Sequence, residues 1–329
     1  MLNGKQCLID LHLHLDGSLS LASVKKLAAL QNIPLPEEAH LRSILSVGPE
    51  CRDLNEYLEK FDYPLSLLQT PEGIAMSVSN LLEELSEQGL MYAEIRFAPQ
   101  LHLMKGLSQR QVVEAAISGL EDAPIPCGLI LCCMRMPDNK AENLETVRLA
   151  KDYLGKGVVA VDLAGAEAVF PTKNFSDEFA LARELAVPYT IHAGEADGRD
   201  SIYTALEFGT KRIGHGIRAW EDPALLKILA ADGITLECCP TSNLNTQIFQ
   251  DLRDYPIRIM LEEGVRFTVN TDNMTVSNTT LAREWQLLMD HFPLERSDVI
   301  RILLNAVDAA FAPDDLKAEL RKKIHRELA

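Results

Sequence analysis

Short apolar or β-branched runs alternate with longer amphipathic segments along nearly the whole chain, and this alternation limits the folds open to it. Such an order is typical of βαβ units, whose strands are parallel. Eight runs have the length and composition of strands: Gln6–Asp10, Tyr92–Phe97, Gly128–Arg135, Val158–Asp162, Tyr189–His192, Arg212–His215, Ile234–Cys238 and Arg266–Asn270. The sequence therefore predicts an α/β fold, a (β/α)8 TIM barrel, for which 329 residues are a natural length.

Amphipathic segments lie between the later strands, as barrel helices would. They are Leu107–Leu120, Asn143–Leu154, Ser176–Leu185, Ser201–Phe208, Pro223–Ala231 and Ile257–Glu263. No repeat and no linker rich in Gly, Pro or Ser marks a second domain, so we expect residues 1–329 to form a single domain.

Two stretches exceed the minimal barrel pattern. The interval between the first two strands is far longer than one connecting helix needs, and it contains the helical patterns Leu19–Gln31, Asp53–Leu68 and Pro71–Gln88. We expect this helical insertion after strand 1 to form a lid or wall over the strand ends. Beyond the eighth strand, the patterns predict a closing helix and extra C-terminal helices packed on the barrel: Leu281–His291, Arg296–Phe311 and Asp314–Leu328.

The charge balance narrows the possible partners. The formal net charge is −16, which argues against binding to nucleic acid or to an anionic membrane, because both require basic surface. The N-terminus shows no secretory signal, and no apolar run is long enough to span a bilayer. The seven cysteines form no Cys-x-x-Cys pattern and are expected to be reduced. We therefore expect a cytoplasmic protein that acts on a small molecule, and the sequence indicates no protein partner.

Two histidines stand one residue apart at the end of the first predicted strand. In a strand, residues i and i+2 point to the same face, so His12 and His14 can direct both imidazoles at one point. Histidine is the commonest protein metal ligand, and such a pair supplies half of a zinc site. Taken alone, the motif is equally compatible with two half-buried structural histidines.

A barrel collects its active site at the C-terminal ends of its strands. Polar residues gather at these ends: His12, His14, Asp16, Asp162, Glu167, His192, Glu195, His215, Asp272 and Asn273. Each of them alone could be a cap, a turn or a core residue. Their joint occurrence predicts an active site. The remaining histidines have no partner pattern and are expected to be structural or solvated: His40, His102, His291 and His325. Of these, His102 lies just after the second strand, in a loop on the site face.

The residue types at these ends suit hydrolysis assisted by a metal. Three imidazoles and one carboxylate form an N/O ligand set that suits one Zn²⁺: His12, His14, His192 and Asp272. Such an ion lowers the pKa of water towards about 7. His215 could then take or orient the water proton, Asp272 could bind the same water, and Glu195 could act as an acid facing the substrate. The alternative for Glu195 is a carboxylate that only stabilises a helix N-terminus.

The ordered motifs resemble those of the adenosine deaminase branch of the metal-dependent amidohydrolases, and the similarity runs from the first strand to the eighth. The motifs are His12-Leu-His14-Leu-Asp16-Gly17, Tyr92-Ala-Glu94-Ile-Arg96-Phe-Ala-Pro99, Asp162-Leu-Ala-Gly165, His192-Ala-Gly-Glu195, Gly214-His215-Gly216, Cys239-Pro240-Thr-Ser-Asn243 and Thr271-Asp272.

The resemblance implies a (β/α)8 barrel with one zinc ion and the conversion of adenosine and 2′-deoxyadenosine to the hypoxanthine nucleosides. It implies that hydroxide adds to purine C6, that Glu195 protonates N1, and that His215 and Asp272 manage the attacking water. It further implies that the Gly165 N–H binds purine N3, that Asp16 contacts the ribose 5′-hydroxyl, and that His14 also borders the substrate.

One position departs from the family pattern. Many members have two consecutive aspartates where this chain has Asp272-Asn273. The second acid is thought to donate a hydrogen bond to purine N7, and an Asn amide can donate without taking up a proton. We interpret Asn273 as a functional substitute that could alter affinity or substrate choice.

Parts of the sequence are also compatible with other functions. The nearest is deamination of another aminopurine, such as adenine, an N6-substituted adenine nucleotide or a modified adenine nucleoside. Related adenine deaminases commonly have Glu at the position of Asp16, which favours a nucleoside here. A metal-dependent phosphoesterase would need more histidines, and a non-catalytic protein would not need Glu195 and His215. The cytidine-type zinc deaminases are excluded because their His-x-Glu and Pro-Cys-x-x-Cys motifs are absent.

Overall fold

The computed structural model describes residues 7–328, and within them eight parallel strands form two four-stranded sheets, β1 to β4 and β5 to β8. The strands are β1 (Leu8–His14), β2 (Leu90–Phe97), β3 (Cys127–Arg135), β4 (Val158–Gly165), β5 (Ile191–Ala193), β6 (Arg212–His215), β7 (Thr235–Cys238) and β8 (Arg266–Val269). Nearly all their residues are buried, as expected for strands covered on both faces.

Backbone contacts join the two sheets at both seams. Between β4 and β5, Val161 bridges Tyr189, and the Thr190 N–H donates to the Val161 carbonyl over 3.0 Å. Between β8 and β1, Asp272 bridges Leu13 and donates its N–H to the His12 carbonyl over 2.8 Å. The predicted (β/α)8 barrel is confirmed, and the second seam places Asp272 beside the histidines of β1.

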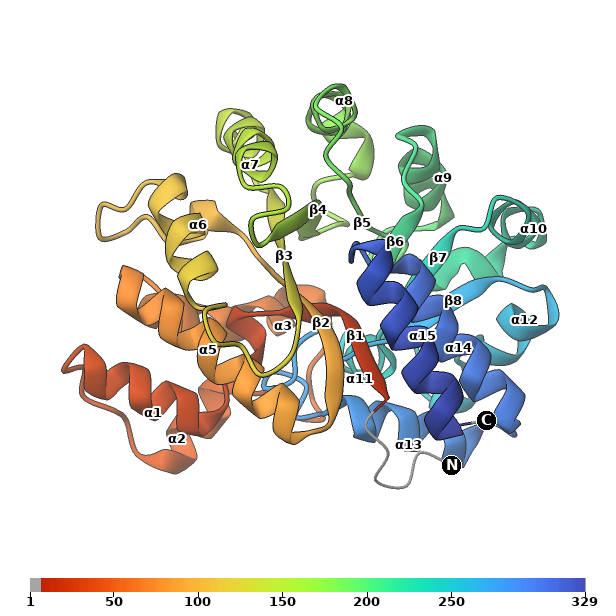
Figure 1. The fold of residues 1–329 in the computed structure, drawn as a ribbon, viewed down its shortest axis with the longest axis horizontal. Coiled ribbons are helices and arrows are strands. Elements are labelled where there is room, and N and C mark those ends of the chain that lie inside the picture. The colour runs from red at the N-terminus through yellow and green to blue at the C-terminus, as the bar shows by residue number, and fades with distance from the viewer. Residues whose placement is uncertain (1–6, 329) are drawn as a thin grey trace.

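Helices surround the strands, and Figure 1 shows them as an arc around the sheet. The helices that follow β2 to β7 are α6 (Gln109–Ser118), α7 (Lys140–Asp152), α8 (Ser176–Glu184), α9 (Arg199–Glu207), α10 (Pro223–Ala231), α11 (Pro240–Asn245) and α12 (Ile257–Glu262). Their apolar faces pack on the strands in one continuous core. The six predicted helices are present to within a few residues, whereas α11 was not predicted because its six residues carry no amphipathic period.

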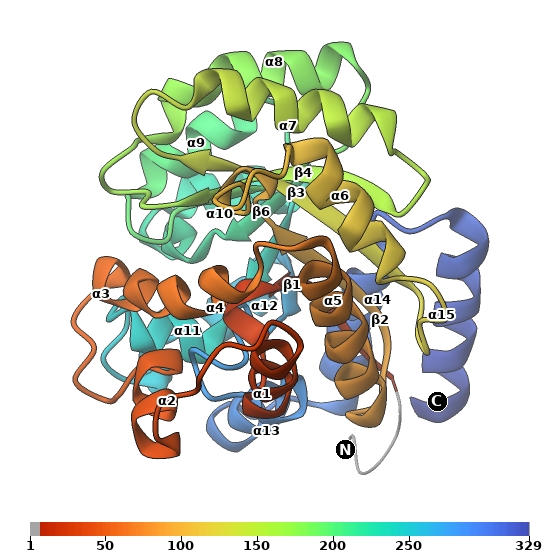
Figure 2. The ribbon, with the colours of Figure 1, turned by 90° about the vertical axis from the view of Figure 1, so that its left-hand side faces the viewer.

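The insertion after β1 is helical, as predicted, but more divided. It contains α1 (Leu21–Leu30), α2 (Glu38–Leu45), α3 (Leu54–Leu58), the 3-10 turn η2 (Glu59–Phe61), α4 (Asp62–Leu67) and α5 (Pro71–Glu87). The expected helix over Asp53–Leu68 is broken into three pieces, and α2 was not predicted. Figure 2 shows α3 and α4 at one end of the barrel, with α15 towards the other end.

After β8 come α13 (Leu281–His291), α14 (Arg296–Ala309) and α15 (Asp314–Leu328), which confirms the extra C-terminal helices. Leu320, Ile324 and Leu328 on one face of α15 are buried, so that face is the packed one. Among the described helices, none combines the length and apolar character that crossing a bilayer requires.

The first strand differs from its predicted bounds. It continues to His14 because Leu13 and His14 pair with Ile95 and Arg96 of β2. The predicted start at Gln6, and most of the N-terminal segment judged to lack a secretory signal, fall outside the described residues.

Candidate active site

A cavity of about 400 Å³ opens at the C-terminal ends of the strands. Leucine and phenylalanine side chains of the insertion form an apolar wall on one side of this cavity: Leu58, Phe61 and Leu65. This is the lid or wall expected from the sequence. Eight predicted site residues line the cavity: His14, Asp16, Gly165, His192, Glu195, His215, Asp272 and Asn273. The ninth, His12, is completely buried beside them.

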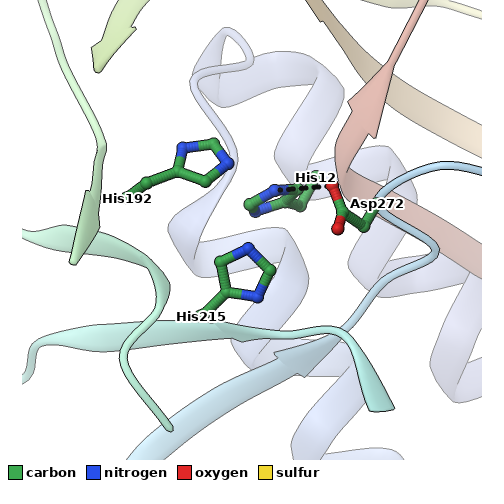
Figure 3. A group of neighbouring side chains, drawn as sticks. All are labelled: His12, His192, His215 and Asp272. Carbon is green, nitrogen blue, oxygen red and sulfur yellow. Dashed lines mark ion pairs between the residues drawn. The ribbon is translucent and has the colours of Figure 1, made fainter. Parts of the chain in front are cut away.

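Figure 3 shows His12, His192, His215 and Asp272 converging from different strand ends, with a contact between His12 and Asp272. One ligand atom from each of these four lies within 4.8 Å of the others. His14 joins the same group. Its Nε2 lies 3.3 Å from His192 Nε2 and 3.4 Å from Asp272 Oδ1. His12 Nε2 is also 3.4 Å from Asp272 Oδ1. Five groups therefore meet at one point.

These separations fit a single ion. Ligand atoms placed at the Zn–N distance on the corners of a tetrahedron lie about 3.3 Å apart. The three distances among His12, His14, His192 and Asp272 match that value. His12 Nε2 is buried and has no hydrogen-bond partner among the described residues, which would be costly unless it bound a ligand. The donor set and its spacing fit a divalent metal.

Two of these imidazoles contact buried carboxylates through Nδ1, the ring nitrogen on the side away from the cluster. Glu237 Oε2 lies 2.7 Å from His12 Nδ1, and Asp162 Oδ2 lies 2.8 Å from His192 Nδ1. A carboxylate at such a distance favours the tautomer with the proton on Nδ1, and Nε2 then presents a lone pair to the centre, as in many metal sites. Asp162 belongs to a motif found in the sequence, whereas Glu237 was not identified.

One guanidinium connects the two carboxylates. Arg96 Nη1 lies 2.9 Å from Asp162 Oδ2, and Arg96 Nη2 lies 2.9 Å from Glu237 Oε2. Glu237 also pairs with Arg212, which in turn pairs with Glu94. Burial by itself would raise the pKa of Asp162, but its interaction with the His192 ring and the charge of the Arg96 guanidinium hold it well below its usual value. Burial would also raise the pKa of Glu237, but the charges of Arg212 and Arg96 hold it well below its usual value, so both carboxylates that orient the histidines stay ionised.

His215 is held in a defined tautomer. The Tyr255 hydroxyl donates to Asn243 Oδ1 over 3.0 Å, so the amide nitrogen of Asn243 faces His215 Nδ1 at 3.1 Å. An amide nitrogen can only donate, so Nδ1 must accept. Burial lowers the pKa of His215 well below its usual value, and the neutral ring then carries its proton on Nε2. Because Nε2 is protonated, His215 is a poorer metal ligand than His14.

Asp272 and His215 both adopt left-handed backbone conformations, with φ of 60° and 58°. Such conformations are uncommon for residues other than glycine and cluster at functional sites. The other oxygen of Asp272, Oδ2, accepts the Ser242 hydroxyl over 2.6 Å. Ser242 and Asn243 both belong to the Cys239–Asn243 motif, which the sequence highlighted without assigning them a contact.

Glu195 combines burial with an unused oxygen. Its Oε1 has no hydrogen-bond partner among the described residues, and its Oε2 lies 3.5 Å from His215 Nε2. Burial raises the pKa of Glu195 well above its usual value, and the negative charges of Asp272 and Glu167 raise it further. Burial and these charges therefore favour the protonated carboxylic acid over the carboxylate.

The remaining predicted residues also face the cavity. Burial raises the pKa of Asp16 to about 6, and its Oδ1 is unpaired among the described residues. Gly165 adopts φ of +107°, which favours glycine. A Cβ on Gly17 would lie 1.8 Å from Asn273 Oδ1, so glycine at this position makes room for the amide. By contrast, His102 does not line the cavity, and its Nδ1–H donates to the Leu68 carbonyl over 2.8 Å.

The adenosine deaminase family model matches residues 7–327 of the chain. An adenosine deaminase from Haemophilus ducreyi is 49% identical over 328 residues, covering 97% of this chain and 95% of the relative. Among solved structures, an adenine deaminase from Arthrobacter aurescens superposes with a TM-score of 0.87 at 26% identity, covering 98% of this chain and 99% of the other.

An Arabidopsis N6-mAMP deaminase superposes with a TM-score of 0.86, also at 26% identity and with 98% of each chain covered. These two structures show that the fold serves more than one aminopurine. The family match spans nearly the whole chain, and the identity to the Haemophilus relative is high over the same length. The chain belongs to the adenosine deaminase family.

Proposed function

We propose that the protein hydrolyses adenosine and 2′-deoxyadenosine to inosine and 2′-deoxyinosine. One water molecule enters and one ammonia leaves in each turnover. The observation that carries this proposal is Glu195, a buried carboxylic acid with one unpaired oxygen beside a cluster of three imidazoles and a carboxylate. A purine ring nitrogen that must be protonated before water can add would find its proton there.

The metal in this proposal is one Zn²⁺ held by His12, His14, His192 and Asp272. The support is the tetrahedral spacing of their ligand atoms and the carboxylates behind His12 and His192. When bound, zinc lowers the pKa of a water molecule towards about 7 and so supplies a nucleophile at neutral pH.

Two residues handle the attacking water. Asp272 is ionised, because His12 and the neighbouring imidazoles lower its pKa although burial would raise it, so its carboxylate can accept that proton. His215 carries its own proton on Nε2 and therefore acts as a donor that orients the water. The tautomer thus favours orientation of the water over proton abstraction by His215.

Three groups bind the purine ring. Glu195 donates its proton to N1, which makes C6 more electrophilic and leaves a carboxylate. The Gly165 N–H donates to N3, and the amide of Asn273 donates to N7. His14 borders the ring, and C6 then lies over the imidazole cluster. The proton taken up by Asp272 then passes to the 6-amino group, the C6–N bond breaks and ammonia leaves, and the proton of the C6 hydroxyl returns to Glu195 as the carbonyl forms.

The cavity favours a nucleoside over a nucleotide. Asp16 is suited to accept a ribose hydroxyl, and Asp62 also lines the cavity. The one guanidinium among the described lining residues, Arg135, is already bonded to the carbonyls of Phe170 and His192 and to Thr172. A phosphate beside Asp16 and Asp62 would meet two carboxyl groups and no unpaired cationic side chain among the described lining residues, which is unfavourable.

The test is the loss of absorbance near the adenine maximum, measured with purified, zinc-loaded protein. Adenosine, 2′-deoxyadenosine, adenine, AMP and N6-methyl-AMP are compared at equal concentrations. We expect the two nucleosides to react fastest. No turnover of either nucleoside, with clear turnover of another compound, would overturn the nucleoside assignment and favour the corresponding alternative.

A further inference from the structure

Glu167, in the loop that follows β4, is almost fully buried, and none of its hydrogen bonds within residues 7–328 goes to the side chain of a predicted metal ligand or of a residue that lines the main cavity. Its carboxylate instead collects main-chain N–H groups from the loop after β5. Oε1 accepts the Gly194 N–H over 2.7 Å, and Oε2 accepts the N–H groups of Glu195, Ala196 and Asp197 over 2.9, 2.8 and 3.0 Å. The Ser201 hydroxyl also donates to Oε1.

This loop carries Glu195, and Arg218 binds the carbonyl groups of the same loop. Arg218, after β6, donates from Nε to the Glu195 carbonyl over 2.9 Å and from its backbone N–H to the Gly194 carbonyl over 3.1 Å. Gly194 makes the turn possible, because its φ is +71° and a Cβ there would lie 2.4 Å from Ile202. The main chain at Glu195 is therefore fixed on both sides.

Four consecutive N–H groups that point at one side chain form a concave site for an anion. A carboxylate fits this site because its two oxygens accept several hydrogen bonds, and bonds to an ionised acceptor are the stronger kind. A carboxamide of the same shape must place its NH₂ group against N–H donors. The four N–H groups therefore require the negative charge and the acceptor oxygens of Glu167, in addition to a side chain of its size.

We propose that Glu167 is a positioning residue that fixes the Glu195 side chain beside purine N1 by holding the N–H groups of residues 194–197. This inference rests on the proposed function, since it takes Glu195 as the proton donor. Glu167 itself does not line the main cavity. Its negative charge also favours the protonated form of Glu195, which supports the same role.

The test compares Glu167→Gln with the unmodified chain in two measurements. In amide hydrogen exchange followed by mass spectrometry, we expect peptides covering 194–197 to exchange at least about 10-fold faster, while distant strands keep their protection. In steady-state kinetics, we expect kcat to fall about 100-fold, the scale for a misplaced reacting group, with a much smaller change in KM.

Glu178→Gln is the matched control. Glu178 is also a buried glutamate, but it lies on α8 and contacts Asn143. We expect this variant to leave kcat and the exchange of 194–197 unchanged. If Glu167→Gln does not fold, Ser201→Ala provides a milder test, because it keeps the four N–H donors to Glu167 and removes one hydroxyl donor, together with the contact of that hydroxyl to Thr172. It should produce smaller changes in the same direction.

Unchanged exchange at 194–197 in Glu167→Gln, or unchanged kcat despite faster exchange, would overturn the inference. A loss of protection spread over the whole barrel would also overturn it, because it would indicate a general role in stability. If the unmodified chain deaminates no purine, the proposed function fails. The exchange experiment would still show whether Glu167 holds the loop.

Discussion

Asp162→Asn should weaken metal binding, although Asp162 is not itself a ligand. Its Oδ2 lies 2.8 Å from His192 Nδ1 and 2.9 Å from Arg96 Nη1, and its Oδ1 accepts the Leu163 N–H over 2.7 Å. An Asn side chain has one oxygen and one NH₂ group, so in either orientation its NH₂ faces a donor. In one orientation of the amide, the Nδ1 proton of His192 has no acceptor. In the other, it shares a neutral amide oxygen with Arg96.

The size of this effect follows from the kind of contact that is lost. Removing the group that orients a metal-bound histidine typically costs 10- to 100-fold in affinity. We therefore expect the zinc dissociation constant to rise by about 10- to 100-fold, equivalent to about 1.4 to 2.7 kcal/mol of binding free energy. The assay is competition for zinc between the metal-free protein and a chromophoric chelator, at a fixed pH.

Glu94→Gln separates this effect from general damage to the core. Glu94 belongs to the same buried charge network and pairs with Arg212 over 2.6 Å. It has no contact with a predicted metal ligand among the ion pairs and hydrogen bonds of the described residues. Both variants should lower the free energy of unfolding, because each leaves a buried cation with fewer partners. If Asp162→Asn binds zinc as tightly as the unmodified chain, or if Glu94→Gln weakens zinc binding equally, the orienting role of Asp162 is refuted.

Three further changes test separate parts of the molecule. Glu195→Gln should keep the metal but lose about 10²- to 10⁴-fold in kcat, the usual share of a general acid; a variant without metal in elemental analysis would contradict that role. Asn273→Asp should remain active with altered KM, because a protonated Asp can also donate to N7, and complete inactivity would disprove the donor assignment. His102→Asn should reduce the acid sensitivity of unfolding. Burial lowers the pKa of His102 to about 4. The unfolded chain binds this proton near pH 6.5 and the folded chain does not, so stability is lost as the pH falls from 6.5 to 4, by up to about 3 kcal/mol. Urea titrations at several pH values should show a smaller loss in the variant.

The sequence was most informative where a strand ends in polar residues. A period of two or a buried apolar pattern predicted the strands. The ends of these strands carry His12, His192, Glu195 and His215, and the barrel places all four at one end. Nothing in the local pattern showed that the insertion would break near Glu59. That break depends on how the short helices fit over the cavity.

The buried charge network could not be assigned from sequence. Glu94 and Arg96 lie two residues apart on β2, so they share a face, but a strand pattern normally reserves that face for apolar residues. Their partners, Glu237 on β7 and Arg212 on β6, become neighbours only when the barrel closes. Pairing across a barrel is a property of the tertiary fold, and no local spacing records it.

The same reasoning explains why Asp272 and His215, the two residues proposed to handle the water, were found by sequence but their conformation was not. Asp272 and His215 have φ near +60°, which the chain tolerates because contacts on both sides oppose relaxation. Asp272 is tied to the backbone of β1 by its N–H and its carbonyl, and His215 is tied to Asn243 by its ring. Strain of this kind fixes the direction of a side chain at a strand end. A centre built from five converging groups needs such fixed directions, because each additional free rotamer would lower the fraction of molecules in which the ligand atoms lie at tetrahedral spacing.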